Sequence, residues 1–171
     1  MGLQLIFVVE TDKKCKSDQI YIKDTIEQFY QYDSAHTKFS FVYMDGKGNY
    51  DRKKIKDEIK ACINPYRGQS FVIYCFDCDD YDSKPEDLAF LNMVNRYCAN
   101  LGYEFVWFCK DIESVYLGRK VPKSQKKAES ASFRGKKQIG NVNANTLLAT
   151  HLKSNTSNLM IILDKYLERK N

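Results

Sequence analysis

The stretch FVIYCFDCDDYD, residues 71–82, sets four aspartates among its last six positions, directly after six uncharged residues. The aspartates are Asp77, Asp79, Asp80 and Asp82. Converging carboxylates repel one another in a partly buried setting, and a hard cation with oxygen ligands is the usual means of holding them together. The stretch therefore predicts either a metal site or a solvated polar turn that follows a buried strand.

Side-chain alternation indicates which residues of this stretch face the same way. On an extended chain Cys75, Asp77 and Asp79 share one face, while Phe76 and Cys78 share the other. The two sulfurs of CFDC then diverge, which argues against a disulfide between them. A zinc site is also disfavoured, because no second CxxC or nearby His completes four ligands. The spacing of the aspartates fails to match an EF-hand calcium loop as well.

The surrounding sequence alternates between strand and helix patterns. Apolar, branched or aromatic runs predict strands at residues 3–9, 38–44, 71–76 and 103–108. Apolar residues at helical spacing predict helices at about residues 17–30, 55–63, 83–101, 111–117 and 158–167. Strands separated by helices of this length predict a parallel sheet with right-handed crossovers, and so a three-layer α/β domain.

Two of these helices begin with capping signals. Ser17 or Asp18 is expected to cap the first helix through its side-chain oxygen. Ser83 and Glu86 form a capping-box pattern, with Pro85 in the first turn of the third helix.

Acidic residues end both the first and the third predicted strand. Glu10 follows the first strand, and Asp77 and Asp79 follow the third. Ligands of open parallel sheets bind at the carboxyl ends of the strands. If these strands are neighbours, as in a 2-1-3-4 order, the carboxylates converge and can share one cation.

The basic residues are concentrated in one segment. The chain has 27 Lys and Arg against 22 Asp and Glu, and residues 119–137 hold eight basic residues against one acidic residue. Such a segment can neutralise phosphates with little sequence preference, and Phe133 could stack on a base. The alternative is a flexible, solvated loop. We predict nucleic-acid contacts from Arg119, Lys120, Lys123, Lys126, Lys127, Arg134, Lys136 and Lys137.

Length and composition predict one domain over residues 1–171, with a core to about residue 118, the basic segment 119–137 and a helical part at 141–168. The six cysteines are scattered over the chain, so most are expected to be reduced. No apolar run approaches the roughly 20 residues of a membrane helix, and the first ten residues lack the features of a signal peptide. These features predict a cytoplasmic protein without a membrane partner.

Isolated histidines offer no catalytic alternative in this sequence. His36 lies in a polar connection and His151 lies near the end of a predicted short helix. We expect both to serve at the surface or in packing.

The acidic motifs resemble those of the Toprim superfamily of topoisomerases, primases and nucleases, and most closely its RloB-like branch. In VVETDKKCKSDQIY, the first motif of that branch is matched by Glu10, Ser17, Asp18 and Tyr21.

Two further motifs extend this resemblance to about residue 118. An aromatic residue followed by Asp-x-Asp-Asp is matched by Phe76, Asp77, Asp79 and Asp80. A glutamate in a short helix after the fourth strand is matched by Glu113 in FCKDIESVYLG.

The resemblance implies a Rossmann-like, three-layer Toprim domain with a four-stranded, mainly parallel sheet and C-terminal helices. It also implies phosphodiester hydrolysis of DNA or RNA with Mg²⁺ or Mn²⁺, in a bacterial or mobile-element defence system that can include a protein partner. Asp77 and Asp79 would hold the cation, Asp80 and Glu113 would be further ligands, and Glu10 would be a ligand or the general acid or base.

A catalytically inactive module remains the alternative function. It would have the same fold and bind nucleic acid or a protein, with a degenerate acidic edge. Phosphotransfer on a nucleotide is disfavoured, because the sequence has no glycine-rich loop of the kind that cradles nucleotide phosphates.

Overall fold

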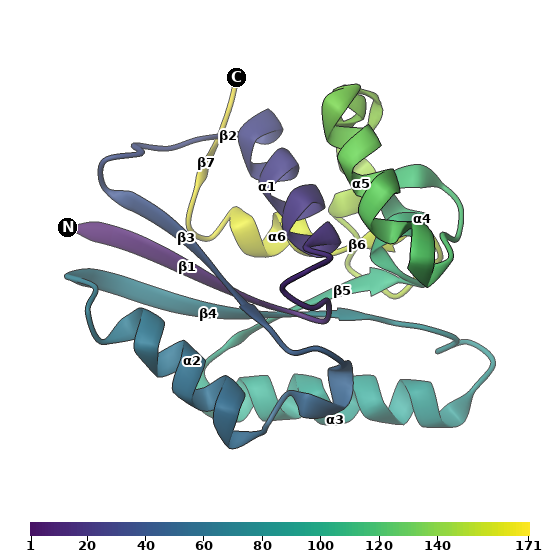
Figure 1. Cartoon of the computed structure of the whole chain (residues 1–171), viewed down its shortest axis with the longest axis horizontal. Coiled ribbons are helices and arrows are strands. Elements are labelled where there is room, and N and C mark those ends of the chain that lie inside the picture. The colour runs from purple at the N-terminus through teal and green to yellow at the C-terminus, as the bar shows by residue number, and fades with distance from the viewer.

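The computed structural model describes all residues from 1 to 171. Its elements follow one another as β1 (Gly2–Val9), α1 (Ser17–Phe29), β2 (Tyr30–Gln31), β3 (Thr37–Tyr43), α2 (Lys53–Ile63), β4 (Gly68–Asp77), α3 (Pro85–Leu101), β5 (Glu104–Cys109), α4 (Ile112–Leu117), α5 (Lys126–Gly135), β6 (Thr156–Ser157), α6 (Leu159–Leu163) and β7 (Glu168–Arg169). Short 3₁₀ turns lie at Lys47–Asn49, Lys123–Gln125, Gln138–Asn141 and Ala144–Leu147. Figure 1 shows three layers, with α2 and α3 on one face of the sheet and the remaining helices on the other.

The central sheet has the order β3-β1-β4-β5-β6. Its first four strands are parallel, and they are the four predicted strands in the expected 2-1-3-4 order. The expected strand count of four is wrong, because β6 adds a fifth, antiparallel strand beside β5. A two-residue strand is too short to show a periodicity in sequence. The α/β class with a mainly parallel sheet is therefore confirmed.

Strand β1 is buried on both faces, as its continuous apolar sequence predicts. Leu5, Phe7 and Val9 pack in the cluster beneath α1, α5 and α6. Ile6 and Val8 pack in the opposite cluster, with α2 and α3. Because β1 pairs with β3 and β4 and is covered by helices on both faces, it is an interior strand of the sheet.

The expected side-chain caps do not form. Lys16 precedes α1 with a φ of 53°, and no side chain caps the helix. Ser17 and Asp18 lie inside the first turn and are buried. At α3 the residue before the helix is Lys84, which also makes no capping bond, so the predicted capping box at Ser83 is wrong.

The basic segment is ordered, so the flexible-loop alternative is wrong. Most of it forms α5, whose inner face packs on α1 and α4. Phe133 is 1% exposed, and its ring meets the edges of Tyr21 and Tyr116 at centroid distances of 5.0 and 5.8 Å. It is therefore a core residue, and the prediction that it stacks on a base is wrong.

The C-terminal helical part is shorter than the sequence predicts. Its helix α6 covers only Leu159–Leu163, although residues 158–167 have a helical pattern. The chain then returns through β7, which pairs with β2. None of the helices combines the length and the apolar character that crossing a membrane requires.

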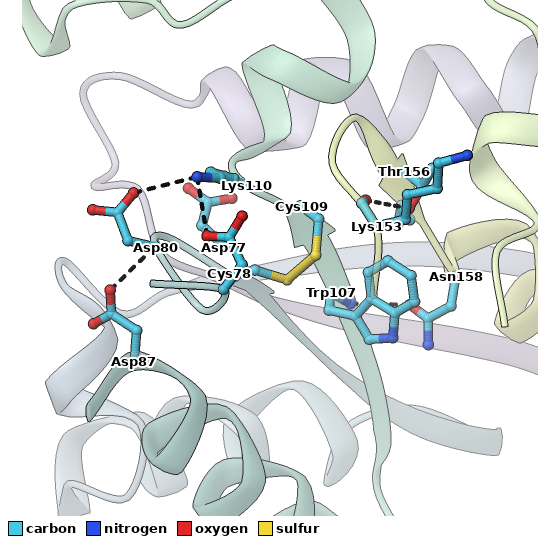
Figure 2. The surroundings of a disulfide bond; sticks show 12 residues. Asp77, Cys78, Asp80, Asp87, Trp107, Cys109, Lys110, Lys153, Thr156 and Asn158 are labelled. Atoms are coloured by element: carbon cyan, nitrogen blue, oxygen red, sulfur yellow. Dashed lines mark hydrogen bonds and ion pairs between the residues drawn. A yellow bond between two sulfur atoms is a disulfide. The ribbon is translucent and has the colours of Figure 1, made fainter. Parts of the chain in front are cut away.

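The cysteines are mostly unpaired, with one exception. Cys78 and Cys109 form a disulfide between the ends of β4 and β5, with Cα atoms 5.0 Å apart (Figure 2). Cys75 remains free, as the divergence of the two CFDC sulfurs predicts. The pair was not predicted, because it depends on the register in which Asp77 lies opposite Phe108.

Candidate active site

The carboxyl ends of β1 and β4 carry the first two residues of the candidate site. Because these strands are adjacent and parallel, Glu10 and Asp77 lie side by side. The Asp77 N–H donates to Glu10 Oε1 at 2.9 Å, and the Ile112 N–H donates to Asp77 Oδ1 at 2.9 Å. The backbone thus fixes one oxygen of each carboxylate and leaves the other oxygen available.

A third carboxylate comes from the first turn of α1. Asp18 is 7% exposed, and its Oδ2 accepts a hydrogen bond of 3.4 Å from the Thr11 N–H. Glu10, Asp18 and Asp77 together line a cavity of about 480 Å³. This volume lies within the range of small-ligand sites, so the cavity can admit a cation and part of a larger substrate.

The fourth carboxylate is the least accessible. Glu113 lies in the first turn of α4, which Asp111 caps. Glu113 is fully buried. Lys126 Nζ lies 3.1 Å from Glu113 Oε2 and forms an ion pair with it. Neither oxygen of Glu113 accepts a hydrogen bond. Lys126 is therefore the one charged partner of this buried carboxylate, and it offsets part of the cost of burying the charge.

Burial and mutual repulsion raise the pKa values of these four residues. Burial raises the pKa of Glu10 to about 8, with smaller contributions from the charges of Asp18 and Asp79. Burial likewise raises the pKa of Glu113 to about 7, although Lys126 opposes the shift. The pKa of Asp77 is raised well above its usual value by burial and then by Glu10, and burial also raises the pKa of Asp18. The cluster therefore retains protons near neutral pH unless a cation neutralises it.

One lysine supplies the internal counter-charge of this cluster. Lys126 was predicted to contact nucleic acid, but its ammonium group turns inward toward Glu113. Although burial disfavours its charge, Glu113 and Asp77 raise the pKa of Lys126. Glu113, Asp77 and Asp18 act on this ammonium group, while Lys47, which forms no ion pair with the cluster, acts on Glu10. The cluster therefore keeps an excess of negative charge when its members are ionised.

Asp79 and Asp80 point away from the cavity. Asp79 has a left-handed φ of 50°, which ends the strand alternation, and its carboxylate forms an ion pair with Lys47. Asp80 lies 2.8 Å from Lys84 Nζ and 3.8 Å from Lys110 Nζ, and Figure 2 shows it directed toward Lys110. The expected sharing of one cation by Glu10, Asp77 and Asp79 is thus not the arrangement that the structure has.

The structure has no complete set of side-chain ligands for a metal ion. No group of three or more His, Cys, Asp or Glu side chains is arranged so that it could hold a metal ion. The nearest approach to such a group is the set of Glu10, Asp18 and Asp77, which line the same cavity.

The predicted nucleic-acid residues divide into two groups. Arg119 pairs with Glu129 at 2.7 Å and Arg134 pairs with Asp24 at 2.5 Å, so both guanidinium groups are engaged within the chain. The exposed residues that form no ion pair are Lys120, Lys123, Lys127, Lys136 and Lys137. Of these, Lys123 and Lys127 line the cavity of the acidic cluster, whereas Lys136 lines a separate cavity between α4 and α5.

Two residues of the site were not predicted to belong to it. Asp18 was expected to serve as a cap, although its match to the first acidic motif was a signal of a role in the site. Lys47 follows β3 and reaches Asp79 across the end of the sheet, a contact for which the sequence has no signal. Beside the cluster, the Tyr21 hydroxyl is buried without a partner, and burial and Glu113 raise its pKa.

The histidines lie outside this site, as expected. His36 contacts Asp33 in an exposed turn, and His151 is exposed beside Thr150.

No protein-family model, no curated protein and no solved structure matches this chain.

Proposed function

We propose that the chain is a metal-dependent nuclease of Toprim type that hydrolyses phosphodiester bonds in DNA or RNA. One observation supports this function above the others. Four carboxylates from distant parts of the chain, Glu10, Asp18, Asp77 and Glu113, converge at the carboxyl edge of a parallel sheet, with Lys126 as the ion-pair partner of the buried Glu113. Such an arrangement favours a hard divalent cation, Mg²⁺ or Mn²⁺, over an apolar or anionic ligand.

The donor set fits a divalent cation. Glu10, Asp18 and Asp77 would hold the cation, since all three line the cavity. Without a cation, burial raises the pKa of each of these carboxylates. When bound, such a cation neutralises charge on a phosphate and promotes ionisation of a water molecule. Asp79 and Asp80 would then act indirectly, because Lys47 and Lys84 hold their carboxylates outside the cavity.

Where Asp18 and Asp77 hold the cation without Glu10, Glu10 is the residue of this chain best placed to move a proton. Its Oε1 is held by the Asp77 N–H, so a proton would reside on Oε2. A pKa of about 8 lies close to neutral pH, where a group exchanges protons most effectively in acid-base catalysis. Glu113 would orient Lys126 and keep its ammonium group beside the reacting phosphate.

A non-catalytic binding module is the second candidate function. Lys126 already neutralises part of the cluster, and no complete set of metal ligands is present. In that case the basic residues would bind nucleic acid or a protein without cleavage. The proposed role in bacterial or mobile-element defence, with a possible need for a protein partner, rests on the resemblance of the motifs alone.

Cleavage of labelled single-stranded DNA, tRNA and plasmid DNA with Mg²⁺ or Mn²⁺ tests the nuclease proposal. We expect metal-dependent cleavage that falls at least a hundredfold in Glu10→Gln and in Asp77→Asn, which preserve the size of the side chains. Asp57→Asn is the matched control, because Asp57 is exposed on α2 and contacts only Lys53. Absence of cleavage, or equal cleavage by all four proteins, would contradict the nuclease proposal.

A further inference from the structure

Two cavities meet at the β1–α1 loop and form one groove across the carboxyl edge of the sheet. The first is the cavity of about 480 Å³ at the acidic cluster, and the second has a volume of about 290 Å³. Both are lined by Asp12, Lys14 and Asp45, so they adjoin one another on the surface. In Figure 1 this loop lies at the carboxyl ends of β1 and β4, between the layer of α5 and the layer of α2.

Five exposed lysines line this groove without forming an ion pair. Lys123 and Lys127 lie at its α5 end, and Lys54 lies at its α2 end. Lys13 and Lys14 project from the loop between them. Unlike Lys126, Arg119 and Arg134, these five ammonium groups have no carboxylate partner within the chain, so they remain available to an anion.

Outside the acidic cluster, the carboxylates that line the groove are fewer than its lysines. Asp12 Oδ1 accepts hydrogen bonds from the N–H groups of Lys14 and Cys15 at 2.8 and 2.7 Å, which lower its pKa and hold the loop in a turn. Asp45 is the other acidic residue that lines both cavities. Outside the acidic cluster, two carboxylates thus face five ammonium groups along the groove, while Glu10, Asp18 and Asp77 of the cluster line its larger cavity beside Lys126.

We propose that this groove binds a single strand of nucleic acid, with its phosphates on the five lysines and one phosphodiester over the acidic cluster. The identity of the ligand rests on the proposed nuclease function. Positive charge lies on both sides of the acidic cluster, as an anionic chain that crosses the cluster requires. We infer a single strand because it can bend to bring one phosphodiester to partly buried carboxylates, whereas a duplex is stiff over this length.

Phosphate contacts, rather than base stacking, provide the affinity in this groove. Tyr43 is the one aromatic residue that lines it, and the hydroxyl of Tyr43 is held by Gln19. Phe133, the aromatic residue of the basic segment, is in the core. Binding is therefore sequence-tolerant and strongly dependent on salt. For a single strand the slope of log K against log salt is about −0.7 per phosphate neutralised, or about −3.5 for five lysines.

Fluorescence anisotropy in EDTA tests this inference separately from cleavage. The probes are a labelled 20-nucleotide single strand and a 20-base-pair duplex, each titrated at several salt concentrations. The variants are Lys13→Gln/Lys14→Gln and Lys123→Gln/Lys127→Gln, which remove charge from opposite sides of the cluster. The control is Lys56→Gln/Lys60→Gln, since these lysines are exposed on α2 outside the groove.

We expect the wild type to bind the single strand at least tenfold more tightly than the duplex. Each groove variant should weaken single-strand binding at least tenfold at low salt and flatten the salt slope by about 1.4, while the control retains both values. Tighter binding of the duplex, no binding, or equal losses in the control and the groove variants would overturn the inference. Binding as expected without any metal-dependent cleavage would overturn only the nuclease proposal.

Discussion

Replacing Glu10 by Gln should stabilise the metal-free protein at alkaline pH. Glu10 has a pKa of about 8 in the folded chain, raised first by burial, against a usual value of 4.5. The folded state therefore binds its proton more tightly than the unfolded state does. Between pH 4.5 and about pH 8, the folded wild type must either retain this proton or bury an unfavourable charge. The free energy of unfolding of the wild type therefore falls as the pH rises through this range. Gln has no such proton to lose.

The size of the effect follows from the shift in pKa. A change from 4.5 to about 8 corresponds to at most about 5 kcal/mol of lost stability at pH 8. Glu10 is only partly shielded from solvent and its neighbours titrate with it, so we expect about 2 to 3 kcal/mol. The Gln side chain can still accept the hydrogen bond from the Asp77 N–H. At pH 5 the two proteins should therefore have similar stability.

Urea denaturation at pH 5 and pH 8 in EDTA measures this difference. The single Trp, Trp107, is 7% exposed in β5 and reports unfolding by its fluorescence. Asp57→Asn serves as the control, because an exposed carboxylate with a lowered pKa does not titrate between pH 5 and pH 8. If the stability difference between Glu10→Gln and the wild type is the same at both pH values, Glu10 is not the desolvated group that the structure indicates.

Two further substitutions test the interior of the site and of the core. Lys126→Met should increase the affinity for Mn²⁺ at least tenfold by calorimetry, because it removes the ammonium group that lies 3.1 Å from Glu113. Lys126→Arg keeps the positive charge and should not increase the affinity. Equal affinities for the wild type and Lys126→Met would contradict the role of Lys126 as the counter-charge of the cluster. Phe133→Ala should lower the free energy of unfolding by about 3 to 5 kcal/mol, because the ring is buried against Tyr21 and Tyr116. A loss below about 1 kcal/mol in urea denaturation would show that the ring is not a core residue.

Local patterns predicted the sheet and one edge of the site. The apolar runs of β1, β4 and β5 are visible in sequence, because a strand buried on both faces must be almost continuously apolar. The edge strand β3 is only partly buried and is visible through its aromatic and branched residues. The alternation of these strands with helices then restricts the topology to parallel crossovers, which brings Glu10 and Asp77 together. The fold class and the nearness of these two carboxylates are thus consequences of period and order along the chain.

The local patterns were misleading where the backbone leaves its regular conformation. Asp79 was placed beside Asp77 by extending the alternation of β4, but a left-handed residue at this point turns its carboxylate to Lys47. Ser17 and Asp18 have the residue types of helix caps, yet packing draws Asp18 into the cavity.

The sequence by itself determined the order of elements, the faces of the strands and the acidic character of the sheet edge. Only the tertiary structure decided that Lys126 neutralises Glu113, that Phe133 enters the core and that Cys78 meets Cys109. The physical reason is that periodicity reports which face of an element is buried, whereas these contacts depend on the partner that covers the face. That partner is set by the packing of α4 and α5 on the sheet and by the register of β4 with β5, to which residues distant in the chain contribute.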